Sequence, residues 1–164
     1  MAVFYSFHYK QDVHRVQLIK NMGIVDGQRL LNSQEWESVR ARGPSAIASW
    51  IDEHMKYKSA VVVLIGRHTA SRPWVLYEIE KAWQAKKPLL GIRIHGLSSL
   101  GHTDSAGADP FTQISGHEGI NPGVPIFDPT VIAWNGSIDS QATYRNLAAN
   151  LRFWSEQGWI RPNW

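Results

Sequence analysis

The stretch 60–65, Ala-Val-Val-Val-Leu-Ile, decides the fold of this chain of 164 residues. It is continuously apolar and rich in β-branched residues, without the alternation of polar and apolar positions that a half-exposed strand shows. Such a run predicts a strand that is buried on both faces, and strands of this kind lie in the middle of parallel sheets. The flanking sequence should then alternate strands with helices.

The flanking sequence shows this alternation. Apolar runs at 2–7 and 88–94 predict two further strands. Weaker strand signals lie at 29–31, 124–127 and 131–134. Apolar residues recur at helical spacing over 11–22, 45–56, 71–86 and 140–157. The pattern predicts an α/β protein with a flavodoxin-like, doubly wound, mostly parallel five-stranded sheet, helices on both faces, and a single domain over 1–164.

Composition excludes several classes of function. The chain has no cysteine, which excludes a disulfide framework, a thiolate zinc site and a cysteine nucleophile. Its seven histidines form no H-E-x-x-H pair, so we expect no metal site. The net charge of +3 is spread along the chain, whereas nucleic-acid binders concentrate basic residues on one face.

The sequence also predicts where the protein is found. No apolar run approaches the length that spans a bilayer. The opening Met1-Ala2-Val3-Phe4 lacks the basic region and cleavage site of a signal peptide. We therefore expect a cytoplasmic protein that binds neither membrane nor nucleic acid.

The expected fold predicts the position of a ligand site. In open sheets of this order, ligands bind beyond the carboxyl ends of the strands, between the first and the third strand. The loops at 7–12 and 66–74 should meet there, and the second loop leads into a helix that contains Glu78. Trp74 lies four residues before Glu78, so both should face one side of that helix.

Glu78 lies at the border of this helix's apolar face, while Glu80 and Gln84 point to solvent. A carboxylate beside an indole at the mouth of the cleft is well placed to act on a ligand. The alternative is an exposed Glu78 that pairs with Lys81 or Lys10, as charged helix residues commonly do. The apolar face itself consists of Val75, Leu76, Ile79, Ala82 and Trp83.

The motif Ser71-x-x-Trp74-x-x-x-Glu78-Ile79 resembles the signature around the catalytic glutamate of TIR domains. The opening Phe4-Tyr5-Ser6-Phe7-His8-Tyr9-x-x-Asp12 departs from the usual TIR start. It is similar to the TIR-like subfamily that includes the NAD-consuming component of the bacterial Thoeris anti-phage system. Val63-Leu64-Ile65-Gly66 followed by Trp74-Val75-x-Tyr77-Glu78-Ile79 is similar to it as well. The resemblance covers residues 3–95 and implies a TIR-like fold.

The resemblance implies that the protein cleaves the bond between nicotinamide and ribose in NAD, with Glu78 as the catalytic carboxylate. The product would be ADP-ribose or a cyclised isomer, a signal that reaches an effector protein. NAD is then the substrate, and no cofactor is implied. Breaking this bond builds oxocarbenium character on the ribose, which a nearby carboxylate stabilises. Two alternatives are a non-catalytic TIR-like module that self-associates, and an enzyme resembling nucleoside deoxyribosyltransferases.

Aromatic and basic residues near the two loops are candidates for binding the substrate. Aromatic rings can stack on nicotinamide or adenine, and arginines can meet the diphosphate. The aromatic candidates are Phe7, Tyr9 and Trp74, and the basic candidates are Arg15, Arg67 and Arg72.

Three polar residues complete the candidate set: His8, Asp12 and Ser71. Each has a structural alternative, as a histidine fixed in the fold or as a helix cap. The polar segment 96–123 leaves the strand 88–94 at the ligand-binding end, so we expect it to flank or cover the cleft.

Overall fold

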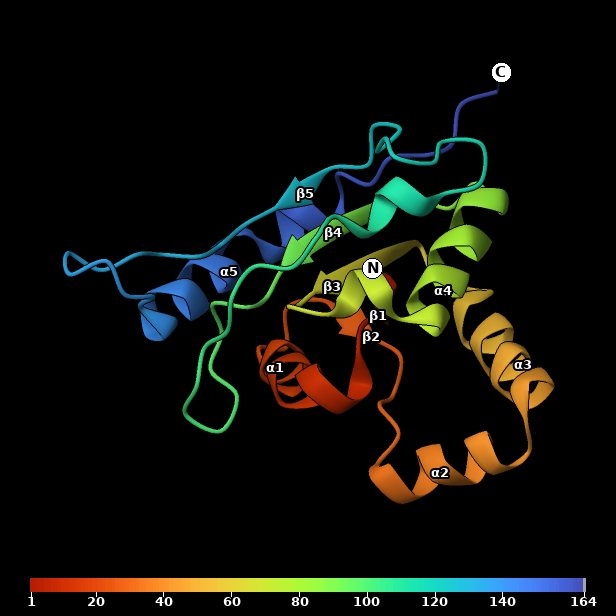
Figure 1. Cartoon of the computed structure of the whole chain (residues 1–164), viewed down its shortest axis with the longest axis horizontal. Helices are drawn as coiled ribbons and strands as arrows, with labels where there is room; N and C mark the ends of the chain where they lie inside the picture. Colours follow the sequence, from red (N-terminus) through yellow and green to blue (C-terminus); the bar gives the residue numbers. More distant parts are fainter. Residues whose placement is uncertain (164) are drawn as a thin grey trace.

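The computed structural model describes residues 1–163 and contains a sheet of five parallel strands in the order β2-β1-β3-β4-β5 (Figure 1). The buried run 60–65 is the central strand and the first strand lies beside it, as predicted. The strands are β1 (Ala2–Ser6), β2 (Asp26–Gly27), β3 (Ala60–Ile65), β4 (Leu89–Arg93) and β5 (Ile126–Phe127). The helices are α1 (Tyr9–Asn21), α2 (Ser33–Ala41), α3 (Pro44–Met55), α4 (Pro73–Gln84) and α5 (Ser140–Ser155), with 3₁₀ turns η1 (Thr69–Ser71) and η2 (Pro110–Gln113).

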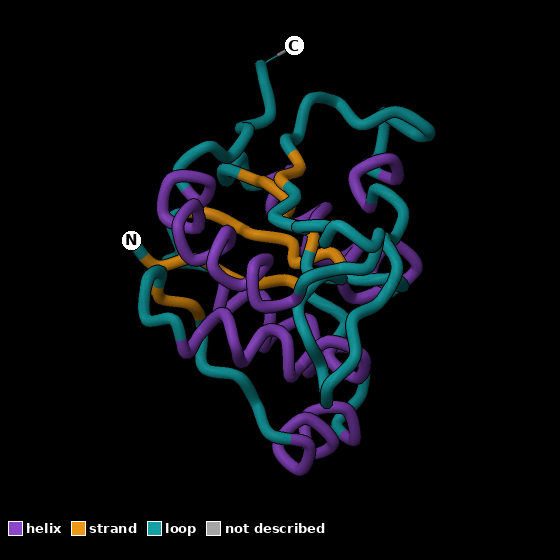
Figure 2. Tube along the Cα trace, turned by 90° about the vertical axis from the view of Figure 1, so that its left-hand side faces the viewer, coloured by secondary structure: helices purple, strands orange, loops and turns teal. Residues whose placement is uncertain are grey.

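The central strand β3 joins two hydrophobic cores because its successive side chains point to opposite faces of the sheet. Val61, Val63 and Ile65 pack with α3 and α4 on one face. Val62 and Leu64 pack with α1 and α5 on the other face. The chain is therefore doubly wound, and Figure 2 shows its loops gathered at the end of the strands away from the N-terminus.

The second strand does not lie where the sequence placed it. Residues 29–31 form no strand, and β2 is Asp26–Gly27, which pairs with the first two residues of β1. The side chain of Gln28 then takes the place of a longer strand. Its Oε1 accepts from the Tyr5 amide at 2.8 Å, and its Nε2 donates to the Tyr5 carbonyl at 2.7 Å. The main chain leaves the sheet edge here, so the residues after Gln28 are free to line a pocket.

The C-terminal part also departs from the pattern. The predicted strand 131–134 is a turn at the surface, joined only by an isolated bridge between Ile132 and Ile138. Trp134 in this turn is 98% exposed. An apolar residue this exposed contributes nothing to the core, so the apolar residues of 131–134 did not indicate a strand.

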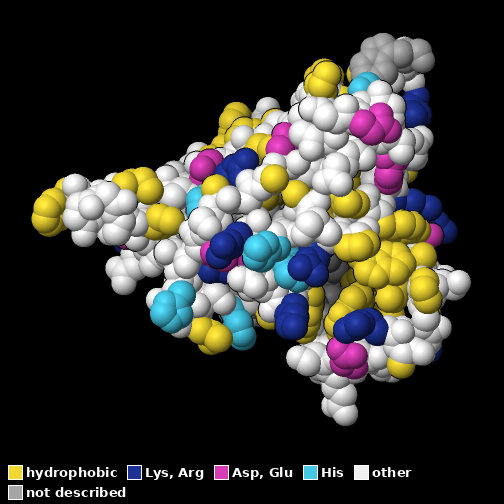
Figure 3. Space-filling view, viewed as in Figure 1, with side chains coloured by type: hydrophobic (Ala, Val, Ile, Leu, Met, Phe, Trp, Pro, Cys, Tyr) yellow, Lys and Arg dark blue, Asp and Glu magenta, His cyan; other side chains and the backbone are white. Residues whose placement is uncertain are grey.

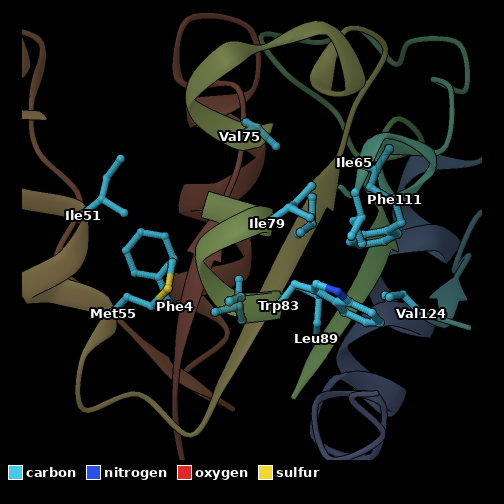
Figure 4. Packing of buried hydrophobic residues seen from close by; sticks show 14 of the residues in the cluster. Phe4, Ile51, Met55, Ile65, Val75, Ile79, Trp83, Leu89, Phe111 and Val124 are labelled. Carbon is cyan, nitrogen blue, oxygen red and sulfur yellow. The ribbon is translucent and has the colours of Figure 1, made fainter. Parts of the chain in front are cut away.

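The segment 96–123 is less loop-like than its composition indicates. It contains η2, and its Phe111 and Ile114 are buried in the same core as Ile79 and Trp83 of α4 (Figure 4). Leu97, in the same segment, is also fully buried, in the core on the other face of the sheet. Polar composition therefore concealed three core residues, and these residues hold the segment against the sheet.

The paired contacts of Gln28 give a prediction about stability. Gln28→Met should leave the amide and carbonyl of Tyr5 without partners at a buried sheet edge, which costs about 2–4 kcal/mol of unfolding free energy. Gln17→Met is the matched control, because Gln17 is exposed and bonds only Asn21, so its effect should stay within about 0.5 kcal/mol. Urea denaturation measures both, and equal midpoints for the two variants would contradict the strand-like role of Gln28.

Candidate functional site

A pocket of about 440 Å³ lies where β1 ends, between α2, α3 and the first turn of α4. This is the position at which open α/β sheets bind ligands. Figure 3 shows hydrophobic side chains gathered between these helices, with lysine and arginine side chains beside them. The lining residues are Phe4, Tyr5, Phe7, His8, Tyr9, Lys10, Gln28, Arg29, Leu30, Leu31, Trp36, Arg40, Trp50, Ile51, Arg72, Pro73, Trp74, Val75 and Glu78.

Glu78 lines this pocket and is only 8% exposed, so it lies deeper than the predicted border position. The Ser6 hydroxyl donates a hydrogen bond of 2.6 Å to its Oε1. Burial raises the pKa of the Glu78 carboxyl to about 8, and the Ser6 hydrogen bond opposes that rise only in part. The solvated alternative is wrong, because Lys81 pairs with Asp52 at 3.6 Å and no ion pair reaches Glu78 within residues 1–163.

The helix α4 turns Glu78 inward because its neighbours on the same side are core residues. Val75, Ile79 and Trp83 are all buried against the sheet, and Glu78 shares their face. The helix begins at Pro73, which is tolerated in a first turn because its missing N–H would have no helical partner. Trp74, one turn before Glu78, lines the same pocket, as the four-residue spacing predicted.

Aromatic rings form the walls of the pocket. The Tyr9 ring stacks on Trp36 with a centroid distance of 6.2 Å, and Phe7 lies 6.1 Å from Tyr9. The Tyr9 hydroxyl donates to the Leu31 carbonyl at 2.6 Å, which fixes the ring. Flat, rigid surfaces of this kind suit a planar heterocycle.

His8 stands at the start of α1 and also lines the pocket. Burial lowers the pKa of His8 to about 4, and the charges of Arg72, His68 and Lys10 act in the same direction. The imidazole is therefore neutral at physiological pH, so it does not cancel the charge of a carboxylate in the pocket.

Four basic residues lie around the pocket, in two different states. Arg29 pairs with Glu35 at 2.6 Å and Arg40 pairs with Glu37 at 3.2 Å, so their charges are already compensated. The other two, Lys10 and Arg72, make no ion pair or hydrogen bond through their side chains in the described part of the chain, residues 1–163. Both lie close enough to His8 to affect its pKa, which indicates a common positive region.

Four of the predicted substrate-binding residues lie outside the pocket lining: Asp12, Arg15, Arg67 and Ser71. Asp12 and Arg15 are fully or almost fully buried and form an ion pair of 2.9 Å. Arg15 also donates to the carbonyls of Leu97 and His102, which anchors the segment 96–123 instead of a ligand. Burial raises the pKa of Asp12, and the Arg15 hydrogen bond opposes that rise.

The helix caps proposed from the sequence are wrong as well. Asp12 lies inside the first turn of α1, whose N-cap is His8. Ser71 ends η1 and donates to the His68 carbonyl at 3.0 Å, while Arg72 occupies the N-cap of α4 without a side-chain capping bond. Arg67 pairs with Asp104 at 3.8 Å and does not line the pocket either.

The segment 96–123 does not cover the pocket, since it supplies none of the lining residues. It runs beside the loop after β3, where Gln113 donates to the Ala70 carbonyl at 2.8 Å. The Arg93 side chain holds the Gly107 carbonyl at 2.7 Å. The segment therefore flanks the ligand-binding end of the sheet without closing over the site.

Sequence reasoning missed Ser6, which holds Glu78, and the pocket wall formed by Leu30, Leu31, Trp36 and Trp50. A strand was expected at 29–31, so those residues were assigned to the sheet and not to a pocket. Trp50 showed only as an apolar position of a helix. The remaining signal was the number of tryptophans, eight in 164 residues, which indicates aromatic surfaces without locating them.

Within residues 1–163, no group of three or more histidine, aspartate or glutamate side chains is arranged to hold a metal ion. In the same residues no helix is both long and apolar enough to cross a membrane.

Comparison with known proteins gives a consistent result. The family model "Thoeris protein ThsB, TIR-like domain" matches residues 4–99, which include both pocket loops and α4. A protein of Bacillus cereus (strain MSX-D12) named "Putative cyclic ADP-D-ribose synthase ThsB1" is 32% identical over 116 residues, covering 66% of this chain and 60% of that protein. The chain thus spans about 60% of the length of this relative. Because the family model covers more than half of the sequence, the chain belongs to the ThsB family of TIR-like domains in Thoeris systems.

Proposed function

We propose that this protein cleaves NAD at the nicotinamide–ribose bond, with Glu78 as the catalytic carboxylate, and releases a cyclic ADP-ribose-type product. That product would be the signal through which the protein activates an effector in anti-phage defence. The observation that carries the proposal is a buried carboxylate without a counter-charge, in a pocket with aromatic walls and free cations at its side.

The chemistry needs few groups. Nicotinamide in NAD carries a positive charge and leaves with the bonding electron pair as a neutral molecule. Positive charge then develops on the ribose, as it does in glycoside hydrolysis. A nucleophilic atom of the remaining ADP-ribose part bonds to the same ribose carbon and closes the ring, and one proton is released to solvent. An ionised Glu78 stabilises the positive charge on the ribose and accepts hydrogen bonds from the ribose hydroxyls. In a pocket of low polarity such a contact is stronger than it would be in water.

The burial of Glu78 favours an enzyme over a passive interaction module. A buried carboxyl with one hydrogen bond and no cation lowers the stability of the fold when it ionises. An interaction module gains nothing from this cost. In an enzyme, a carboxylate of raised pKa beside a cleft is typical of a catalytic group.

The residues that line the pocket support a dinucleotide substrate. The aromatic walls at Tyr9, Trp36 and Trp74 offer surfaces for the two planar bases. Lys10 lies in the first turn of α1, and Arg72 is the N-cap residue of α4. Neither side chain has a partner within residues 1–163, so both are free to meet the diphosphate. Neither cation forms an ion pair with Glu78, so the carboxylate remains available to the ribose.

The first prediction concerns Glu78 itself. Glu78→Gln should lower NAD turnover about a hundred- to a thousandfold, because the amide supplies no negative charge to the transition state. The fold should persist, since glutamine can still accept the hydrogen bond from Ser6. Chromatography of the products and thermal unfolding measure the two effects.

Two variants serve as controls for this prediction. Glu53→Gln changes an exposed glutamate of α3 and should leave turnover unchanged. Asp12→Asn tests the other carboxylate near the β1 end, which is buried and ion-paired, and should affect mainly stability. Full turnover by a folded Glu78→Gln protein would show that the catalytic carboxylate has been misassigned.

The raised pKa of Glu78 predicts the pH dependence of turnover. The ionised form is active, so kcat/KM should rise roughly tenfold per pH unit below the pKa and level off above about pH 8. Bound NAD places a cationic nicotinamide near the carboxylate and lowers its pKa, so kcat should level off at a lower pH than kcat/KM. A rate that is constant between pH 6 and 8, measured on the active protein, contradicts this assignment.

The free cations predict an effect on substrate affinity. Lys10→Gln and Arg72→Gln should each raise KM, on the order of fivefold or less because both side chains are exposed, and should leave kcat nearly constant. Arg67→Gln is the control, since Arg67 is also exposed but pairs with Asp104 outside the pocket. Equal KM values for all three variants would show that the diphosphate does not bind at Lys10 and Arg72.

A further inference from the structure

A single hydrogen bond connects the catalytic candidate to the sheet. Ser6 is the last residue of β1, is fully buried, and donates from its Oγ to Oε1 of Glu78 at 2.6 Å. The two residues are 72 positions apart in the sequence. The backbone of Ser6 is fixed by the pairing of β1 with β3, where it lies opposite Val63. The donor therefore belongs to a buried strand whose position is fixed by its pairing in the sheet.

Within residues 1–163, the Glu78 side chain makes no other hydrogen bond or ion pair, and its Oε2 has no protein partner. From α3 the pocket receives only the uncharged Trp50 and Ile51. Other elements contribute charged or titratable groups to the lining, but none of these contacts Glu78. They are Tyr5 of β1, His8, Tyr9 and Lys10 around the start of α1, Arg29 before α2, Arg40 of α2 and Arg72 before α4.

We propose that Ser6 is a positioning residue for Glu78: its hydroxyl holds Oε1 and so directs Oε2 toward the sugar hydroxyls of the substrate. The catalytic part of this inference rests on the proposed function. A glutamate without this anchor has three rotatable bonds, and the orientations that it samples include unproductive ones. Ser6 replaces this freedom with one orientation that is set by the sheet.

The same contact affects the charge of the carboxylate. Burial favours the neutral form of Glu78, and a hydroxyl that donates to the carboxylate favours the ionised form. A hydrogen bond to a charged group changes the ratio of ionised to neutral form by more than about tenfold. Loss of Ser6 should therefore move the ionisation of Glu78 to a higher pH.

The pH dependence of the unfolding free energy measures the ionisation of Glu78 without any substrate. The pKa of Glu78 is raised on folding, so the stability that depends on this group is fully present at low pH and is lost as pH rises through about 8. Glu78→Gln lacks that loss. The difference in unfolding free energy between the two proteins should grow above about pH 5 and level off above about pH 8.

The decisive experiment repeats this comparison without the Ser6 hydroxyl. The difference in unfolding free energy is now taken between Ser6→Ala and the double variant Ser6→Ala, Glu78→Gln. It should level off at a higher pH than the difference between wild type and Glu78→Gln. Ser155→Ala is the matched control, because Ser155 is also fully buried but its Oγ has no partner. In this background the stability difference should level off at the same pH as in wild type. Ser6→Thr keeps the hydroxyl and should restore the wild-type behaviour. If Ser6→Ala does not fold, Ser6→Cys replaces it, since cysteine is a weak donor of similar shape. The pH at which the stability difference levels off should then lie above the wild-type value, by less than is expected without any donor.

Turnover completes the test. Ser6→Ala should lower kcat at pH 7 by about tenfold or more with a smaller change in KM, and the deficit should shrink at pH 9. If the stability difference levels off at the wild-type pH in both Ser6→Ala and Ser6→Cys, the proposal is overturned, even if Glu78→Gln is inactive and the proposed function holds. A shifted levelling-off in a protein whose NAD turnover does not depend on Glu78 would confirm the contact. It would nevertheless overturn both its catalytic role and the proposed function.

Discussion

The parallel pairing of β1 with β3 is the constraint on which the rest of this structure depends. Val3 to Ser6 lie opposite Ala60 to Val63, and every one of these residues is buried. This register fixes where β1 ends, and therefore where Ser6 meets Glu78 and where the aromatic loop begins. It also brings the start of α1 against the end of β3, where Gly66 leaves room for Asp12. A Cβ at Gly66 would lie 2.1 Å from the Asp12 carboxylate.

Sequence patterns located the elements of this fold better than the roles of individual polar side chains. The run 60–65 identified the central strand because burial on both faces leaves a continuous apolar signal. The pocket residues Phe7, Tyr9 and Trp74 followed from the loops and the four-residue helical spacing. By contrast, Asp12 and Arg15 lie near the same loop but turn away from the pocket. Their partners include the carbonyl of a residue 82 positions from Arg15, which no local pattern shows.

The same limit explains the missed residues. Ser6 becomes part of the site only through a contact with a residue on a distant helix. Residues 29–31 carry a local strand signal, but the side chain of Gln28 occupies the sheet edge that a strand would need. Local strand propensity is weak against such tertiary contacts. The pocket wall that results could be found only from the folded chain.

The energetics of the pocket agree with its proposed chemistry. The fold holds an ion pair between Asp12 and Arg15 in its interior, so it can compensate a buried carboxylate where structure alone requires it. At Glu78 it supplies a single neutral donor instead, and it keeps His8 neutral nearby. The charge that best compensates an ionised Glu78 is then the one that develops on the substrate. Membership in the ThsB family and the relative named as a cyclic ADP-D-ribose synthase support this interpretation.

A crystal structure of the Glu78→Gln protein with NAD tests the central claim most directly, because the variant should bind the dinucleotide without consuming it. The expected result places the ribose of the nicotinamide half within hydrogen-bonding distance of side chain 78, with the diphosphate between Lys10 and Arg72. NAD bound outside the pocket, or bound with its nicotinamide ribose away from position 78, would contradict the role assigned to Glu78.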